Sequence, residues 1–223
     1  MTSLTVRQYK NSDYPVVIRI FTQGCYGLTL PAFYNALRVP QNWLLLLASF
    51  LLPLVTLGSI FLAFLDVFVV LIVLWLCGRE FFHSYARKAL AKDLKDIRKY
   101  YLQQEGHNFW VAESNNEVVG MVAALPLYLP RGEKHIELQR MSVARNHRGK
   151  GIAQVLCKTV IDFARKEGCK AIVLSTTTIQ RDAVHLYQKM GFRSTQTSYM
   201  TQLTERLAGL EWIYLRYDIS SST

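Results

Sequence analysis

The chain has 223 residues, a formal net charge of +10 and a hydrophobic fraction of 51%. This length accommodates one sizeable domain without requiring two. The basic surplus suits nucleic acid, an anionic membrane or an anionic small ligand, but no nucleic-acid-binding motif is present, so nucleic acid is disfavoured. The four cysteines lack paired spacing and the five histidines are scattered, which argues against disulfides and against a metal site.

The first residues combine a strand pattern with a helix pattern. Residues 4–9 alternate like a half-buried strand. Residues 11–13 (Asn-Ser-Asp) provide capping side chains for a helix that we predict to run through Val16 and Phe21.

Residues 43–77 are almost uninterrupted apolar side chains, with Asp66 as their one charged residue. This segment is too long and too uniform for a core helix. Because one membrane span needs about 20 residues, the segment exceeds one span and is slightly short for two. Pro53 and the pair Gly58-Ser59 lie near its middle, where they favour a bend or a tight hairpin.

Basic residues flank this segment on both sides, which places both of its ends in the cytosol by the positive-inside rule. A helical hairpin or a re-entrant loop satisfies this rule, whereas a single tilted span would separate the two ends. We favour the hairpin, with Asp66 interpreted as a residue at its tip; a functional role is the alternative. The flanking residues are Arg38 on one side and Arg79, Arg87, Lys88, Lys92 and Lys95 on the other.

The rest of the chain alternates between helix and strand patterns and predicts one mixed α/β domain. The order β-α-α-β-β-β-α-β-α-β-β divides the chain into 1–42 (first part of the domain), 43–77 (membrane hairpin or re-entrant segment) and 78–223 (main part). The elements expected after the insertion are a basic amphipathic helix at the membrane surface (81–101), strands 109–113 and 118–125, a loop containing Pro126, Pro130 and Gly132, strand 136–143, a helix from Ile152 to Gly168, strand 171–174, helix 179–190 before Gly191, and strands 193–200 and 211–219.

Residues 143–153 form a strand end, a basic glycine-rich turn and a helix start. Glycines let a backbone pass close to a ligand, and the free amides of a helix N-terminus bind phosphate oxygens. Arg148 and Lys150 add a screened attraction for the same anion. The spacing matches neither a Walker loop nor the dinucleotide-binding fingerprint.

Two motifs resemble the GNAT acetyltransferase superfamily. Arg148-Gly149-Lys150-Gly151-Ile152-Ala153 is similar to its R/Q-x-x-G-x-G/A signature. Residues 180–192 (QRDAVHLYQKMGF) resemble its second motif, N-x-x-A-x-x-L-Y-x-x-x-G-F. The resemblance covers most of residues 1–40 and 80–223, and implies a GNAT mixed sheet flanked by helices.

Further features resemble the camello-type membrane branch of this superfamily. These are residues 109–114 (FWVAES), residues 119–122 (VGMV) and the apolar insertion. The branch includes cysteine S-conjugate N-acetyltransferase and the membrane-bound aspartate N-acetyltransferase, and it is associated with endoplasmic reticulum and Golgi membranes. The resemblance therefore implies an enzyme on one of these membranes with its catalytic domain facing the cytosol.

The resemblance also implies direct acetyl transfer from acetyl-CoA to an amine and assigns the cofactor contacts. Backbone amides of Arg148, Gly149, Lys150, Gly151, Ile152 and Ala153 would hold the pyrophosphate. Met141, Ser142 and Val143 would pair with the pantetheine arm and polarise the thioester carbonyl. Gln180 replaces the usual asparagine of the second motif, which puts that residue's cofactor contact in doubt.

The resemblance further assigns an acid and a base. Tyr187 corresponds to the tyrosine that protonates the departing CoA thiolate; packing between helix and sheet is its alternative role. Glu137 matches a glutamate that serves as base in some members, with a structural ion pair as the alternative. His135 is a lesser candidate for the base.

The acceptor stays open among a cysteine S-conjugate, aspartate or another amino acid, and a protein lysine or N-terminus. Arg140 and Arg145 are candidates to bind an acceptor carboxylate, or are ordinary surface charges. A non-catalytic acetyl-CoA sensor or membrane scaffold is the alternative function.

Overall fold

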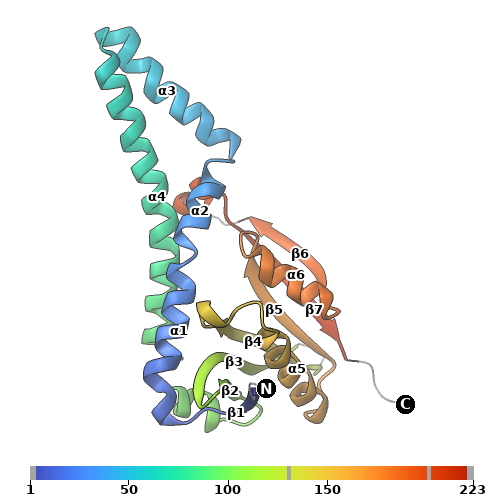
Figure 1. Cartoon of the computed structure of the whole chain (residues 1–223). Helices are drawn as coiled ribbons and strands as arrows, with labels where there is room; N and C mark the ends of the chain where they lie inside the picture. The colour runs from blue at the N-terminus through green and yellow to red at the C-terminus, as the bar shows by residue number, and fades with distance from the viewer. Residues whose placement is uncertain (1–3, 130–131, 200–201, 220–223) are drawn as a thin grey trace.

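The computed structural model describes residues 4–129, 132–199 and 202–219, and these form a seven-stranded mixed sheet with helices on both faces (Figure 1). The strand order is β1-β2-β3-β4-β5-β7-β6. The strands are β1 Leu4–Gln8, β2 Asn108–Ser114, β3 Glu117–Tyr128, β4 Lys134–Val143, β5 Ala171–Thr177, β6 Arg193–Tyr199 and β7 Glu211–Asp218. The α-helices are α1 Tyr14–Tyr26, α2 Thr29–Ala36, α3 Pro40–Leu57, α4 Ile60–Ala91, α5 Ile152–Lys166, α6 Arg181–Lys189 and α7 Leu203–Leu207, with short helical turns η1 Asn11–Asp13, η2 Arg98–Leu102 and η3 Arg145–His147.

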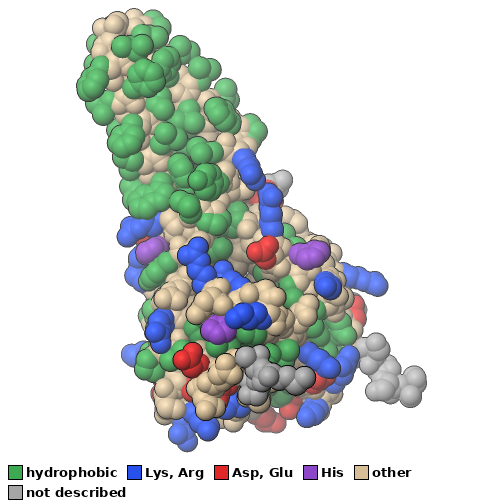
Figure 2. Space-filling view, in the orientation of Figure 1, with side chains coloured by type: hydrophobic (Ala, Val, Ile, Leu, Met, Phe, Trp, Pro, Cys, Tyr) green, Lys and Arg blue, Asp and Glu red, His purple; other side chains and the backbone are tan. Residues whose placement is uncertain are grey.

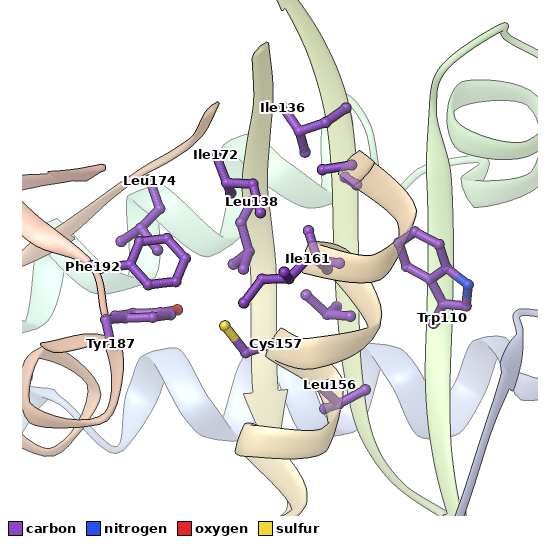
Figure 3. Packing of buried hydrophobic residues seen from close by; sticks show 14 of the residues in the cluster. Trp110, Ile136, Leu138, Leu156, Cys157, Ile161, Ile172, Leu174, Tyr187 and Phe192 are labelled. Carbon is purple, nitrogen blue, oxygen red and sulfur yellow. The ribbon is translucent and has the colours of Figure 1, made fainter. Parts of the chain in front are cut away.

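The two faces of the sheet support separate cores, which explains why its central strands are apolar on both sides. In β2, Trp110 and Ala112 face α5, whereas Phe109 and Val111 face α1 and the end of α4. Figure 3 shows Trp110 on one side of α5 and Tyr187 of α6 on the other. The predicted mixed sheet flanked by helices is therefore confirmed.

Strand β1 belongs to the same sheet as the strands that follow the apolar insertion. It pairs antiparallel with β2 from Leu4 opposite Ser114 to Gln8 opposite Trp110. The two ends of the insertion are therefore joined to one sheet.

The apolar segment forms two antiparallel helices that project from the domain (Figure 1). The turn lies at Gly58, whose φ of 60° is left-handed, and at Ser59, whose Oγ accepts from the Leu62 amide at 3.4 Å. Pro53 does not end the helix and lies inside α3. Asp66 lies exposed in the second turn of α4, close to this tip.

The surface of this hairpin is apolar on the outside, with basic side chains only near its base (Figure 2). Val55 is 79% exposed and Phe61 is 73% exposed. Three helical stretches are long and apolar enough to cross a membrane by length and composition: 11–36, 40–57 and 60–91. The first of these contains α1, whose Val17 and Phe21 are buried against the sheet, so we assign it to the domain.

The base of the hairpin is fastened to the C-terminal part of the domain. Asn42 is fully buried, and its Nδ2 donates to the Ala36 and Leu207 carbonyls at 2.8 and 2.7 Å. Asn35 Nδ2 donates to the Gly209 carbonyl at 2.7 Å. These contacts hold the start of α3 against the end of α7.

The separate amphipathic helix predicted over 81–101 is wrong. Helix α4 continues from the hairpin to Ala91, because no proline interrupts the change from apolar to basic residues. The chain then turns at Lys92, and only the short turn η2 follows. Residues 81–91 of the predicted surface helix are therefore the C-terminal part of α4, the second arm of the hairpin.

Smaller differences concern loops and short helices. Pro126, expected in a loop, lies within β3 opposite Ile136. Helices α2 and α7 were not predicted, because short helices carry too few turns to show a period. Pro130 of the predicted loop and Met200 of the predicted strand lie outside the described residues.

An ion pair ties the start of α1 to β1 and gives a pH-dependent contribution to stability. Arg7 donates to Asp13 at 2.7 Å, and the Lys10 amide donates to the same carboxylate at 2.8 Å. Burial alone would raise the pKa of Asp13, but these hydrogen bonds together lower it. A lowered native pKa stabilises the fold above the unfolded value of about 4, and this contribution is lost as the pH falls through the native pKa.

Asp13→Asn should therefore lower the melting temperature at pH 7 by about 4–8 °C, corresponding to about 2 kcal/mol. The difference from the wild type should shrink as the pH falls below about 4, because the carboxylate of the unfolded state then takes up its proton while the native one still resists protonation. Thermal melts in mild detergent across pH 3–8 measure this. Asp162→Asn, which removes an exposed ion pair with Arg165, is the matched control and should change little. If Asp13→Asn lowered the melting temperature by the same amount at every pH, the ionised Asp13 carboxylate would not be the source of the stabilisation.

Candidate functional site

Strands β4 and β5 are parallel neighbours for only a short distance. Their pairing covers His135 to Glu137 against Ala171 to Val173. Beyond Glu137, β4 continues to pair with β3, and β5 continues to pair with β7. We call the space between Leu138–Val143 and Leu174–Thr177 the strand divergence; along it, β4 has no partner strand on its β5 side among the residues described.

The predicted pantetheine strand, Met141-Ser142-Val143, lies along the strand divergence. Met141 and Val143 pack against the core beneath α5. The Ser142 hydroxyl points to the other face, where it lies 3.5 Å from the Ile20 carbonyl. A ligand in the divergence would therefore meet these residues mainly through their backbone.

The glycine-rich turn leads directly from the end of β4 into α5. Gly149 and Gly151 have φ values of 76° and 77°, which glycine adopts without strain. A Cβ at Gly149 would meet no atom within 4 Å, and one at Gly151 would approach only the Gln154 side chain, at 3.9 Å. The turn therefore leaves room for a ligand next to its backbone.

The start of α5 leaves its first backbone amides without a side-chain cap. Its N-cap is Gly151, so no side chain caps the first amides, including those of Ile152 and Ala153. Such amides and the helix dipole favour phosphate oxygens. Lys150 is exposed beside them, and Arg148 Nε donates to the Val143 carbonyl at 3.2 Å. The residues present thus suit the pyrophosphate of acetyl-CoA.

Tyr187 on α6 is buried at the edge of the core next to the strand divergence. Its ring packs against Phe192 with centroids 5.4 Å apart. Figure 3 shows its hydroxyl directed toward Cys157 of α5. In the described part of the chain this hydroxyl forms no hydrogen bond, and burial raises the pKa of the phenol, which stays protonated. The packing role is thus visible, and the hydroxyl is free to serve as a donor.

Gln180 occupies the N-cap position of α6. Its Nε2 donates to Thr177 Oγ1 at 3.1 Å, at the end of β5. Gln180 therefore lies at the far end of the strand divergence, and its side chain joins β5 to α6.

Glu137 lies at the last β4–β5 pair, opposite Val173, where the divergence begins. It is partly buried, and it forms no ion pair within the described segments, in contrast to the structural alternative that its sequence position allowed. Glu137 is close enough to Tyr85 to raise the pKa of that phenol, although burial is the larger cause. A partly buried carboxylate without an ion-pair partner is available as a proton acceptor.

His135 and Arg140 do not fit the roles considered for them. His135 is 1% exposed at the closed end of β4, where burial lowers its pKa, so it does not reach an acceptor. Arg140 is bound to the protein's own Asp93, with Nε and Nη2 each 2.8 Å from a carboxylate oxygen. It is therefore not free for a substrate carboxylate. Arg145 remains exposed, without an ion pair in the part of the chain described.

Sequence reasoning missed the residues around Arg140, namely Asp93, Tyr85 and Tyr101. Asp93 lies within the range of the helix predicted over 81–101 and was given no role there, yet it is 2% exposed. Nothing in the local sequence distinguishes Asp93 from Asp96, because the partner of Asp93, Arg140, is 47 positions away along the chain.

Comparison with known proteins places this geometry in a family. The model of the acetyltransferase (GNAT) family matches residues 73–192. The chain is 39% identical to N-acetyltransferase 8B of Rattus norvegicus and 40% identical to N-acetyltransferase 8 of the same species and to N-acetyltransferase 8F1 of Mus musculus. Each comparison covers 223 residues and 100% of both proteins.

Solved structures agree on the fold. A ribosomal-protein-alanine N-acetyltransferase from Brucella melitensis matches with a TM-score of 0.58 and 16% identity, over 96% of this chain and 99% of that one. A GNAT-family acetyltransferase from Staphylococcus aureus Mu50 matches with a TM-score of 0.57 and 15% identity, over 98% of this chain and 100% of that one. With its divergent β4 and β5, its glycine-rich turn and these relatives, the chain belongs to the GNAT family and is an acetyl-CoA-dependent N-acetyltransferase related to the N-acetyltransferase 8 proteins.

Proposed function

We propose that this protein is a membrane-anchored N-acetyltransferase that binds acetyl-CoA in the strand divergence and acetylates an amine at the cytosolic face of the membrane. The observation that carries this proposal is the end of β4–β5 pairing at Glu137, which leaves the rest of β4 without a β5 partner up to the glycine-rich turn. A backbone edge without a strand partner there offers hydrogen bonds to the pantetheine arm.

The cofactor contacts follow from the positions already described. Amides from Arg148 to Ala153 bind the pyrophosphate, and the backbone of Met141, Ser142 and Val143 runs beside the pantetheine arm. Gln180 lies at the opposite edge, near the end of β5. Backbone donors of Met141, Ser142 and Val143 stabilise the oxyanion that forms when the amine attacks the thioester carbon.

The proton transfers use two residues on either side of the divergence. Glu137, directly or through water, accepts the proton that the attacking amine must lose. Collapse of the tetrahedral intermediate breaks the bond between carbon and sulfur and releases CoA thiolate, which takes a proton from the Tyr187 hydroxyl. The products are the N-acetylated acceptor and CoA.

The shape of the chain supports a membrane hairpin. Eighteen residues of α3 extend about 27 Å, close to the hydrocarbon thickness of about 30 Å. Because β1 pairs with β2 across the insertion, a segment that enters the membrane must also return, so a single span does not fit. Basic residues at the base, such as Arg38 and Arg79, favour the cytosolic side for the domain.

The compartment and the acceptor follow from the resemblance rather than from the geometry. We place the protein on endoplasmic reticulum or Golgi membranes, with an acceptor drawn from cysteine S-conjugates, other amino acids and protein amines. A membrane anchor favours acceptors that are lipophilic or membrane-associated. A non-catalytic acetyl-CoA sensor is the less favoured alternative, since the glycine turn and Tyr187 are both intact.

The experiment that tests this function follows CoA release from acetyl-CoA in mild detergent, with S-benzylcysteine, aspartate and a lysine peptide as acceptors. Turnover with one acceptor supports the proposal and identifies the acceptor class. Binding of acetyl-CoA without turnover in a widened acceptor panel would favour the sensor. Folded protein that fails to bind acetyl-CoA would overturn the proposal.

Gly151→Glu should weaken acetyl-CoA binding by about 100-fold, because it adds a negative charge and a strained left-handed residue next to the pyrophosphate. Isothermal titration with acetyl-CoA measures this. Gly168→Glu is the matched control, since Gly168 ends the same helix, has a φ of 66° and is open to solvent. Equal affinities of the two variants would argue against a pyrophosphate site at the start of α5.

Tyr187→Phe should lower kcat by about 100-fold while leaving the melting temperature nearly unchanged, because phenylalanine keeps the packing on Phe192 but cannot donate a proton. Glu137→Gln should lower kcat/KM by a similar factor, because the amide cannot accept the proton of the attacking amine. Steady-state kinetics from pH 5 to 9 measure both. Wild-type kinetics in Tyr187→Phe would leave Tyr187 with the packing role alone.

The full chain should stay with the membrane fraction after alkaline carbonate extraction, because its hairpin exposes apolar surface on both helices. In sealed microsomes, tags at the N-terminus and at the C-terminus should both be digested by added protease. Protection of one tag would indicate a single span and would contradict the hairpin. Release by carbonate would contradict membrane insertion.

A further inference from the structure

Arg140 holds a backbone conformation that arginine rarely adopts. Its φ is 55°, in the left-handed region that costs a non-glycine residue about 1–2 kcal/mol. It lies in a β-bulge, since β4 advances three residues from Gln139 to Ser142 while β3 advances two, from Ala123 to Met121. The bulge begins just past Glu137, where β4 leaves β5.

The side chain of Arg140 is held at every nitrogen. Nε and Nη2 donate to the two oxygens of Asp93, each at 2.8 Å, and Nη1 donates to the Tyr85 hydroxyl at 2.7 Å. The guanidinium also lies 5.5 Å from the ring centre of Phe21. Its side chain is 11% exposed, so water competes little for these contacts.

Asp93 is fixed from a different direction. Its Oδ2 also accepts from the Tyr101 hydroxyl at 2.5 Å, and Tyr101 is fully buried. Asp93 follows the end of α4 at Ala91, so it does not belong to the sheet. The ion pair thus joins the bulge of β4 to the chain that leaves the hairpin helix.

The φ of Arg140 sets the direction of the backbone that follows it, at Met141 and Ser142. A residue released from the left-handed region would rotate the peptide toward Met141 and change where its amide and carbonyl point. Strained residues persist where their surroundings fix them, and such positions concentrate at functional sites. Here the fixing contacts come from the buried carboxylate of Asp93.

We propose that the Asp93–Arg140 ion pair is a positioning device that fixes the β4 bulge so that its backbone donors meet the acetyl carbonyl of acetyl-CoA. This inference rests on the proposed placement of acetyl-CoA in the strand divergence. Arg140 itself does not touch the substrate, because its guanidinium is used entirely by Asp93, Tyr85 and the ring of Phe21.

Arg140→Lys tests the proposal with the buried positive charge retained. Lysine cannot form the forked contact with both oxygens of Asp93, so the bulge should lose its fixed direction. We expect kcat to fall by about 10- to 100-fold, the effect of a small misplacement at a reacting centre. The Kd for CoA, which lacks the acetyl group, should change less than about twofold.

Arg140→Gln and Asp93→Asn extend the test to the pair. Each should lower kcat by a similar factor, and the double variant should be no worse than the more affected single one, because both remove the same interaction. The kinetics are measured well below the melting temperature of every variant, with the folded fraction checked by circular dichroism. Additive losses in the double variant would contradict a shared positioning role.

Arg7→Gln is the matched control. Arg7 forms ion pairs with Asp13 and Glu113 at 2.7 Å but lies on β1, remote from the divergence. It should lower the melting temperature and leave kcat unchanged. If the Arg140 and Asp93 variants behave in the same way, their ion pair only stabilises the fold and the inference is overturned. Absence of wild-type turnover would instead overturn the proposed function, and this inference with it.

Discussion

The pairing of β1 with β2 is the constraint on which the arrangement of this protein depends. These strands lie on opposite sides of the hydrophobic insertion, yet they form consecutive backbone pairs from Leu4 to Gln8. A chain that leaves a sheet and must return to the neighbouring strand can cross an apolar layer only as a hairpin. The turn at Gly58 and Ser59 and the two antiparallel arms satisfy this requirement. For a hairpin that enters a membrane as proposed, this strand pairing keeps the whole sheet on one side of it.

The same sheet creates its site by ending one pairing early. Parallel neighbours normally share hydrogen bonds along their length, but β4 and β5 do so only up to Glu137 and Val173. The bulge at Arg140 bends β4 at this point, while β5 keeps its partner β7. The backbone polar groups left without a strand partner would be costly in an apolar core. In the proposed function, the polar, extended arm of acetyl-CoA would remove that cost, and the uncapped N-terminus of α5 would bind its phosphates.

Much of the fold could be predicted because its signals are local. The alternation in residues 4–9, the uniform apolar run 43–77 and the glycine-rich turn each report on their own neighbourhood, and the structure confirms the elements that they predict. The helix expected over 81–101 was misplaced for the opposite reason. A basic amphipathic pattern does not show whether a helix begins there or continues from an apolar one. The short helices α2 and α7 are held by contacts such as Asn35 with Gly209, which no local pattern reveals.

The site was only partly accessible to the same reasoning. The roles of Tyr187 and Glu137 that the resemblance implied stay predictions. Arg140 was considered as a receiver for a substrate carboxylate, and it does bind a carboxylate, but that of Asp93. The sequence shows which charged residues exist. It does not show that Asp93 and Arg140, which are 47 positions apart along the chain, pair with each other. The buried pair could be found only once the chain was folded.

The length of α4 connects these observations. One continuous helix carries the apolar arm of the hairpin and ends at Ala91, directly before Asp93. Asp93 lies just beyond the end of this helix and contacts the bulge through two charge-assisted hydrogen bonds. In the proposed arrangement, α4 thus connects the apolar hairpin to the residue that supports the bulge, and removal of the hairpin is expected to change that support as well as the location of the protein.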